Sequence, residues 1–227
     1  MRKGQQDFVT VALDVDQSVL LEVIDSHRQT DITASVMQQP VELREAVREV
    51  SVDMWGGFPK VIAQVYPNAR LVFDRFHLIR LVIQELNKIR WIIGIKDRHS
   101  KYLLRRNRID LNFEQKQELD RVLKKSECLK IAYQFKEEFQ NIYQRSRTVN
   151  TVRRELEKWM KTARLFYSSS VQTIRKHFDR ICNYFRDRTT NGGIEGINNR
   201  IKLIKRQGYG FSNFDNFRRL LACLGIR

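Results

Sequence analysis

Two aspartates, Asp53 and Asp74, each follow a short run of apolar and β-branched residues. These runs predict buried strands over residues 49–53 and 69–73, and the spacing of residues 58–66 predicts a helix between them. A strand, a helix and a strand at this spacing form a parallel unit, so both carboxylates should lie at one edge of a sheet. Carboxylates at that edge bind Mg²⁺, and two such ions promote phosphodiester chemistry. The alternative is that each aspartate caps the helix after it.

A third acidic residue, Glu195, lies in the first turn of a helix predicted over residues 194–204. Offsets of three, four and seven residues place Asn198, Asn199 and Lys202 on the same helix face. An acidic residue that faces amides and a lysine suits a metal ligand with phosphate contacts beside it. The alternative is an acid that stabilises the helix N-terminus through the helix dipole.

Basic residues gather in two segments, residues 98–108 with Tyr102 among them, and residues 200–206 beside Tyr209. Cations interleaved with an aromatic residue are typical of surfaces that follow a nucleic-acid backbone. For the first segment a solvated loop is an equally good interpretation, whereas the second lies within two turns of Glu195. The candidate phosphate-binding residues are Arg98, Lys101, Arg105, Arg106, Arg108, Arg200, Lys202, Lys205 and Arg206.

The charge balance also indicates nucleic acid. The 227 residues include 42 Lys and Arg against 26 Asp and Glu, for a net charge of +16. Residues 1–53 carry a net charge of −5, and residues 54–227 therefore carry +21. An acidic head and a basic body fit a carboxylate metal site set in a phosphate-binding surface. The bland alternative is that the charge only keeps the protein in solution.

Composition excludes several classes of protein. No run approaches 18 apolar residues, and the first residues lack the apolar core of a secretory signal, so we expect a cytoplasmic protein with no membrane contact. Cys128, Cys182 and Cys223 are too far apart for a zinc cluster and odd in number, which disfavours a disulfide framework.

The remaining patterns predict a small α/β unit, then a long helical stretch, then a returning helix. Residues 8–13 and 19–24 should form a hairpin, and Lys136 should lie on a solvated helix face with Glu137 and Glu138. Further helices are predicted over residues 30–38, 41–48, 76–95, 113–125, 129–145, 149–163, 171–186 and 214–224.

Five motifs, in this order, carry a resemblance to a known family. They are Val50-Ser51-Val52-Asp53-Met54-Trp55, Tyr66-Pro67-Asn68-Ala69, Phe73-Asp74-Arg75-Phe76-His77, Asn191-Gly192-Gly193-Ile194-Glu195-Gly196-Ile197-Asn198-Asn199-Arg200-Ile201-Lys202 and Tyr209-Gly210-Phe211-Ser212-Asn213-Phe214. Together they resemble the DDE transposases of bacterial insertion sequences, in the ISL-three-type branch, and the resemblance runs essentially from end to end.

The resemblance implies a ribonuclease-H-like core that a long all-helical insertion interrupts. Residues 1–74 would form part of the core, residues 75–190 the insertion, and residues 191–227 the helices that return the last catalytic residue. Asp53 would be the second catalytic carboxylate and Glu195 the third, both binding Mg²⁺ or Mn²⁺.

The remaining residues near the predicted site have supporting roles in this interpretation. Asp74 and His77 match a motif whose role is supportive, although a single histidine at a helix start is more often structural. Asn198 and Asn199 would lie beside the metal ligands. The partner would be double-stranded DNA, namely the element's ends and the target, on which several copies could assemble.

One departure from the family pattern affects the expected activity. The family carries its first catalytic Asp on a strand just before a segment like Arg2-Lys3-Gly4-Gln5, and this sequence begins at Met1. We therefore expect a truncated chain without that strand, without the usual N-terminal DNA-binding region, and inactive in strand transfer. The alternative function is a basic DNA-binding protein without catalysis.

Overall fold

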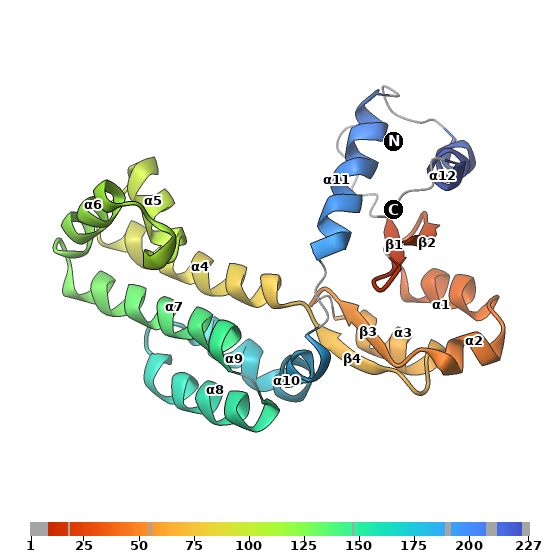
Figure 1. The fold of residues 1–227 in the computed structure, drawn as a ribbon, viewed down its shortest axis with the longest axis horizontal. Coiled ribbons are helices and arrows are strands. Elements are labelled where there is room, and N and C mark those ends of the chain that lie inside the picture. Colours follow the sequence, from red (N-terminus) through yellow and green to blue (C-terminus); the bar gives the residue numbers. More distant parts are fainter. Residues whose placement is uncertain are drawn as a thin grey trace. The chain divides into compact units, whose positions relative to one another are not determined.

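The computed structural model of the chain describes residues 9–17, 19–54, 56–146, 148–188, 192–207 and 213–223, without the side chains of residues 192–195, 198, 205, 222 and 223. The chain divides into two compact units (Figure 1). One unit comprises Met1–Asp74 together with Arg188–Arg227, and the other comprises Arg75–Asp187. Among the described residues, no helix combines the length and the apolar character that a membrane span requires.

The first unit begins with an antiparallel hairpin, as the sequence predicts. Strand β1 (Thr10–Asp14) pairs with β2 (Val19–Ile24), and the register is irregular between Ala12 and Leu13. The Asp14 carboxylate accepts a hydrogen bond from the backbone N–H of Gln17, which closes the turn.

A parallel strand pair follows and confirms the predicted strand–helix–strand unit. Strand β3 (Glu49–Val52) pairs with β4 (Arg70–Phe73), and helix α3 (Phe58–Val65) connects them. In the described part of the chain, the hairpin and the parallel pair form two separate two-stranded sheets. Helices α1 (Gln29–Met37) and α2 (Val41–Ala46) precede β3. Helix α1 packs on α3 through a small apolar cluster that includes Ile32, Val61 and Val65.

Two C-terminal helices return to this unit, α11 (Gly192–Gln207) and α12 (Phe214–Cys223). Ile197 of α11 is buried with Phe217 and Leu221 of α12 against Val23 of β2. Ile197 and the partly buried Ile201 and Ile204, which pack against the same cluster, therefore form the inner face of α11.

The second unit contains only helices in its described residues, labelled along the chain in Figure 1. They are α4 (Arg75–Ile92), α5 (Arg98–Arg105), the short 3-10 helix η1 (Arg108–Asp110), α6 (Phe113–Leu123), α7 (Glu127–Arg145), α8 (Val149–Ala163), α9 (Ser168–Lys176) and α10 (Phe178–Asp187). One prediction was wrong here, because the helix predicted over 171–186 is two helices that meet at His177. Residues 98–108, for which a solvated loop was one of two interpretations, are mostly helical.

Aromatic side chains from three helices fill the core of this unit. Phe139 of α7 packs 4.8 Å from the ring of Trp159 of α8, and that ring lies 5.6 Å from Tyr167. The polar atoms are satisfied across the helices: Trp159 Nε1 donates to the Phe135 carbonyl, and the Tyr167 hydroxyl donates to the Ala132 carbonyl at 2.6 Å. The rings are thus packed together, and Trp159 and Tyr167 are also hydrogen-bonded to α7, which fixes α7 against α8.

The prediction that Lys136 lies on a solvated face of α7 is wrong. Its side chain is fully buried and donates to the Arg106 carbonyl at 2.7 Å and to Glu137 at 2.5 Å. The ammonium also lies 4.2 Å from the ring centroid of Tyr133. Because desolvation disfavours the charged form, the pKa of Lys136 falls to about 8. Lys136 therefore ties the segment after α5 to α7, which a surface lysine would not do.

Candidate functional site

The parallel strand pair brings the two predicted aspartates together. Val52 and Phe73 are paired in the register of β3 and β4, so Asp53 and Asp74 follow equivalent positions on adjacent strands. The backbone N–H of Asp74 donates to the Val52 carbonyl at 3.0 Å, which extends the pairing as far as this residue. Asp74 is buried, with 8% of its surface exposed, whereas Asp53 is exposed. One carboxylate is therefore held in the fold and the other faces solvent.

His77, three residues after Asp74, completes a group of possible metal ligands. One ligand atom from each of Asp53, Asp74 and His77 lies within 4.8 Å of the other two. Ligands of a single Mg²⁺ or Mn²⁺, bound at about 2.1 Å, lie about 3 to 4.2 Å apart. At least two of the three pairs would have to be neighbours on the ion, about 3 Å apart, so the side chains would approach one another by up to about 1.8 Å on binding. Two carboxylates and an imidazole are donors that divalent metals accept, so the donor set fits such an ion.

Asp53 is not the N-cap residue of α3, because Gly57 occupies that position. Asp74 directly precedes the first residue of α4, Arg75. A capping role for Asp74 and its place in the metal-ligand group are compatible, because a carboxylate has two oxygens.

Glu195 lies in α11, in the same compact unit as Asp53. Its side chain is outside the described part of the structure, as are those of Asn198 and Lys205. The grouping of Glu195 with Asp53 therefore stays a prediction. Along the described remainder of this helix, Asn199, Arg200, Lys202 and Arg206 are exposed to solvent.

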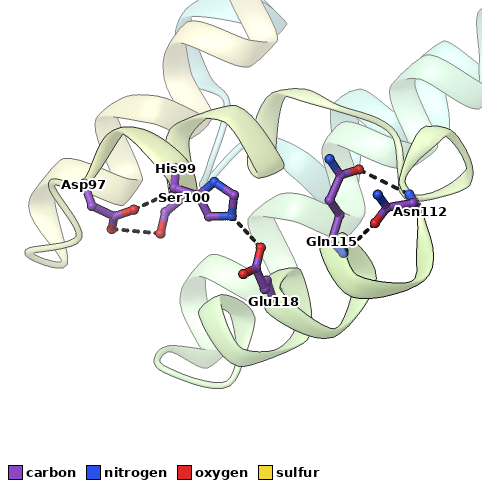
Figure 2. A network of polar contacts seen from close by, with 6 residues as sticks. All are labelled: Asp97, His99, Ser100, Asn112, Gln115 and Glu118. Carbon is purple, nitrogen blue, oxygen red and sulfur yellow. Dashed lines mark hydrogen bonds and ion pairs between the residues drawn. The ribbon is translucent and has the colours of Figure 1, made fainter.

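The first basic segment is an amphipathic helix. Helix α5 buries Ser100, Leu103 and Leu104, and Asp97 caps its N-terminus by accepting from the backbone N–H and the hydroxyl of Ser100 (Figure 2). These two hydrogen bonds lower the pKa of Asp97. The opposite face carries the predicted phosphate-binding residues. They are Arg98, Lys101 and Arg105, all exposed.

The last predicted cation of this segment already has a protein partner. The Arg108 guanidinium donates to both carboxylate oxygens of Asp120, at 2.5 and 2.8 Å. Through these bonds Arg108 lowers the pKa of Asp120, and Asp120 raises the pKa of Arg108. Since part of its charge is neutralised, we expect Arg108 to attract an anion less strongly than the exposed cations of α5.

Two buried charged residues, which no sequence pattern marks, hold the segments beside these surfaces. Glu85 of α4 accepts hydrogen bonds at the start of α9, and Arg90 of α4 donates to the carbonyls of Ile95 and Asp97 just before α5. No local pattern distinguishes a buried charge on a long helix from an exposed one. The start of α5 could have been found, because Asp97 followed by Ser100 has the spacing of a helix cap.

Comparison with protein families decides the class of the chain. Residues 1–221 match the family described as Transposase, the ISL3 group of DDE transposases. The chain belongs to this transposase family. The match covers both the parallel unit with Asp53 and Asp74 and the helix with Glu195, so the sequence resemblance is confirmed.

Two curated relatives extend this comparison. The transposase for insertion sequence element IS1001 of Bordetella parapertussis is 25% identical over 235 residues, an alignment that covers 96% of this chain and 57% of the relative. A protein of Lactococcus lactis subsp. lactis named ATP-dependent protease is 31% identical over 103 residues, 44% of this chain and 32% of that protein. The chain thus spans little more than half of the first relative and about a third of the second.

Proposed function

We propose that the chain supplies the catalytic part of an insertion-sequence transposase, which cuts DNA strands and transfers their ends by metal-dependent phosphodiester chemistry. The observation that carries the proposal is the joint placement of Asp53, Asp74 and His77 in a chain of the DDE transposase family. In this proposal, Asp53 and Glu195 are the catalytic carboxylates. Asp74 and His77 support them.

We further propose that the first unit is a ribonuclease-H-like core and that the helical unit is an insertion in it. The hairpin, the parallel pair and the returning α11 follow one another along the chain as the resemblance implies, which supports this proposal. The insertion would occupy residues 75–190, after residues 1–74 and before residues 191–227. This arrangement carries Glu195 back to the unit that holds Asp53, because α11 packs on the hairpin.

Asp53 and Glu195 would hold Mg²⁺ or Mn²⁺, and Asp74 and His77 could supply further donor atoms beside Asp53. When bound, such ions lower the pKa of a water molecule and stabilise the charge that develops on a phosphate. His77 adds a nitrogen donor, and imidazole suits transition metals better than it suits Mg²⁺. If His77 is a ligand, the site should therefore prefer Mn²⁺ over Mg²⁺. The carboxylates bind the ion, and the exposed position of Asp53 leaves that side open to DNA.

Double-stranded DNA, at the element's ends and at the target, would be the partner. The exposed cations of α5 and of α11 would bind its phosphates, since lysine and arginine contacts to phosphate dominate the affinity for DNA. Several copies would assemble on the DNA, and in a bacterial cell this partner places the protein in the cytoplasm at the nucleoid.

The test is strand cleavage by the purified chain on DNA that carries the ends of its own element. We expect nicking with Mn²⁺ or Mg²⁺, and a loss of at least a hundredfold in Asp53→Asn and in Glu195→Gln, because each removes a metal ligand. Glu114→Gln, an exposed acid on α6, is the matched control and should cut like the wild type. Cleavage that persists in Asp53→Asn would exclude the proposed catalytic role.

A second candidate function is DNA binding without catalysis. The charge of +21 on residues 54–227 favours it, because this charge binds DNA whether or not a metal site is complete. The expectation that the chain is inactive finds no support in the fold or in the comparisons. A salt-sensitive gel shift with no cleavage under any divalent metal would favour this second function over the first.

A further inference from the structure

Two exposed aromatic side chains lie in residues 91–106, which comprise the end of α4, the loop after it and helix α5. We call these residues the α4–α5 corner. Trp91, near the end of α4, is 50% exposed, and Tyr102, on α5, is 42% exposed. Neither ring completes the core of the helical unit, because the aromatic residues of that core are almost fully buried. Both rings are therefore accessible to another molecule.

A cation lies over each of these rings. The Lys96 ammonium is 5.9 Å from the ring centroid of Trp91, and the Arg106 guanidinium is 5.4 Å from that of Tyr102. His99 stacks beside Tyr102 at 6.4 Å, with the two planes inclined by 25°. The corner therefore combines half-exposed rings with positive charge at the ring faces.

A buried arginine, Arg90, holds the backbone of the corner in place. Arg90 is 2% exposed, and its guanidinium donates to the Ile95 carbonyl at 2.5 Å and to the Asp97 carbonyl at 3.1 Å. Gly94 adopts φ of +80°, a conformation that other residues rarely take, so the chain can turn sharply here. These interactions fix the loop that carries Lys96 beside Trp91.

Helix α5 is fixed in the same way. Asp97 caps its first turn, and His99 pairs with Glu118 of α6, whose own N-terminus is closed by a capping box between Asn112 and Gln115 (Figure 2). In the described part of the chain, no ion pair is found for Arg98, Lys101 or Arg105. Their charges therefore remain available to an anionic ligand, on a helix that would not need to reorganise.

We propose that the α4–α5 corner binds unpaired DNA nucleotides, with Trp91 and Tyr102 stacking on bases. The cations of the corner bind the phosphates of the same strand. They are Lys96, Arg98, Lys101, Arg105 and Arg106. A duplex offers phosphates but hides the faces of its bases, whereas unpaired nucleotides offer both, which matches the pairing of rings and cations. The inference rests on the proposed function only in taking DNA as the ligand.

The test compares two labelled DNAs by fluorescence anisotropy at low salt, an oligothymidylate of about 16 nucleotides and a duplex of mixed sequence. Trp91→Ala and Tyr102→Ala should each weaken binding of the oligothymidylate about 5- to 140-fold, the range that corresponds to one lost stacking contact. Duplex binding should change less than about twofold. Trp91→Phe keeps a ring and should retain most of the affinity.

Charge variants give a different signature. Lys101→Gln should weaken the binding of both DNAs. The slope of the logarithm of the binding constant against the logarithm of the salt concentration should become shallower by about 0.7 for the single strand and about 0.9 for the duplex, as expected for one lost phosphate contact. Lys161→Gln and Leu165→Ala, an exposed cation and an exposed apolar residue elsewhere in the helical unit, are the matched controls and should bind like the wild type.

Three results would overturn the inference. Wild-type affinity of Trp91→Ala and Tyr102→Ala for the oligothymidylate would refute the stacking role, and preserved duplex binding would then leave the proposed function standing. A change in oligomeric mass of Trp91→Ala, with unchanged DNA affinities, would identify the ring as a protein interface. If the wild type bound neither DNA, DNA binding itself would be refuted, in the proposed function as well.

Discussion

Glu85 offers a sharp test of how the helical unit is held together. The residue is 6% exposed, and its carboxylate accepts from the backbone N–H of Ser169 at 3.0 Å and of Ser170 at 2.8 Å, and also from the Ser170 hydroxyl. These are first-turn N–H groups of α9, whose own N-cap residue, Tyr167, provides no side-chain acceptor. A carboxylate of α4 thus caps a helix more than 80 residues further along the chain.

The variant Glu85→Gln keeps the shape but replaces one acceptor oxygen with an amide donor. One N–H of α9 then has no acceptor, which costs about 1 to 3 kcal/mol, and the loss of charge at the positive end of the helix adds up to about 2 kcal/mol. We expect the free energy of unfolding to fall by about 2 to 4 kcal/mol. Glu85→Ala should cost more, because it leaves both N–H groups without the carboxylate.

The assay is urea unfolding followed by far-ultraviolet circular dichroism, together with amide hydrogen exchange at Ser169 and Ser170. Exchange at these two amides should accelerate in Glu85→Gln even under native conditions. Glu138→Gln, an exposed acid on α7, is the matched control and should stay within about 0.5 kcal/mol of the wild type. The same small change in Glu85→Gln, with unaltered exchange, would refute the capping role.

Two further predictions concern stability. The pKa of Lys136 falls from 10.5 in the unfolded chain to about 8 in the fold, so between these pH values the unfolded state binds more protons than the folded state. The free energy of unfolding should therefore rise with pH across this window, by about 3 kcal/mol from this residue. Lys136→Met should abolish that rise. The measurement is the free energy of urea unfolding of the variant and of the wild type at pH 7.5 and at pH 10. The same pH dependence in both proteins would contradict the burial of Lys136. Ile197→Ala should lower the free energy of unfolding of the first unit by about 2 to 4 kcal/mol, since Ile197 is 5% exposed, whereas Leu21→Ala, at a residue 63% exposed, should change it little. Equal effects of these two substitutions in urea unfolding would contradict the packing of α11 on the hairpin.

Local patterns carried enough information for the elements of the first unit. The apolar and β-branched runs on either side of the hairpin turn and before Asp53 and Asp74 predicted β1 to β4. The strand–helix–strand spacing predicted the parallel pairing of β3 with β4, which the register confirms. The two aspartates then had to come close together, because parallel strands end at the same edge. His77 lies in the first turn of α4, three residues after Asp74, and the motif that carries it predicted a supporting place near the site.

The errors have a common physical cause, namely tertiary contacts that leave no local signature. The two glutamates beside Lys136 predict a solvated face, but its ammonium is buried and donates a hydrogen bond to the Arg106 carbonyl. The break between α9 and α10 has no proline or glycine to mark it. Instead the N–H of His177 bonds to the carbonyls of both Thr173 and Ile174, which ends one helix where the next begins.

The central claim is that Asp53 and Glu195 hold the same metal site. It can be tested directly by replacing the metal with Fe²⁺ and letting ascorbate and peroxide generate hydroxyl radicals, which cut the backbone next to the bound ion. Mass spectrometry of the fragments should show cuts near residues 53, 74–77 and 195, all lost in Asp53→Asn. Cuts confined to residues 53–77, with none in α11, would contradict the account.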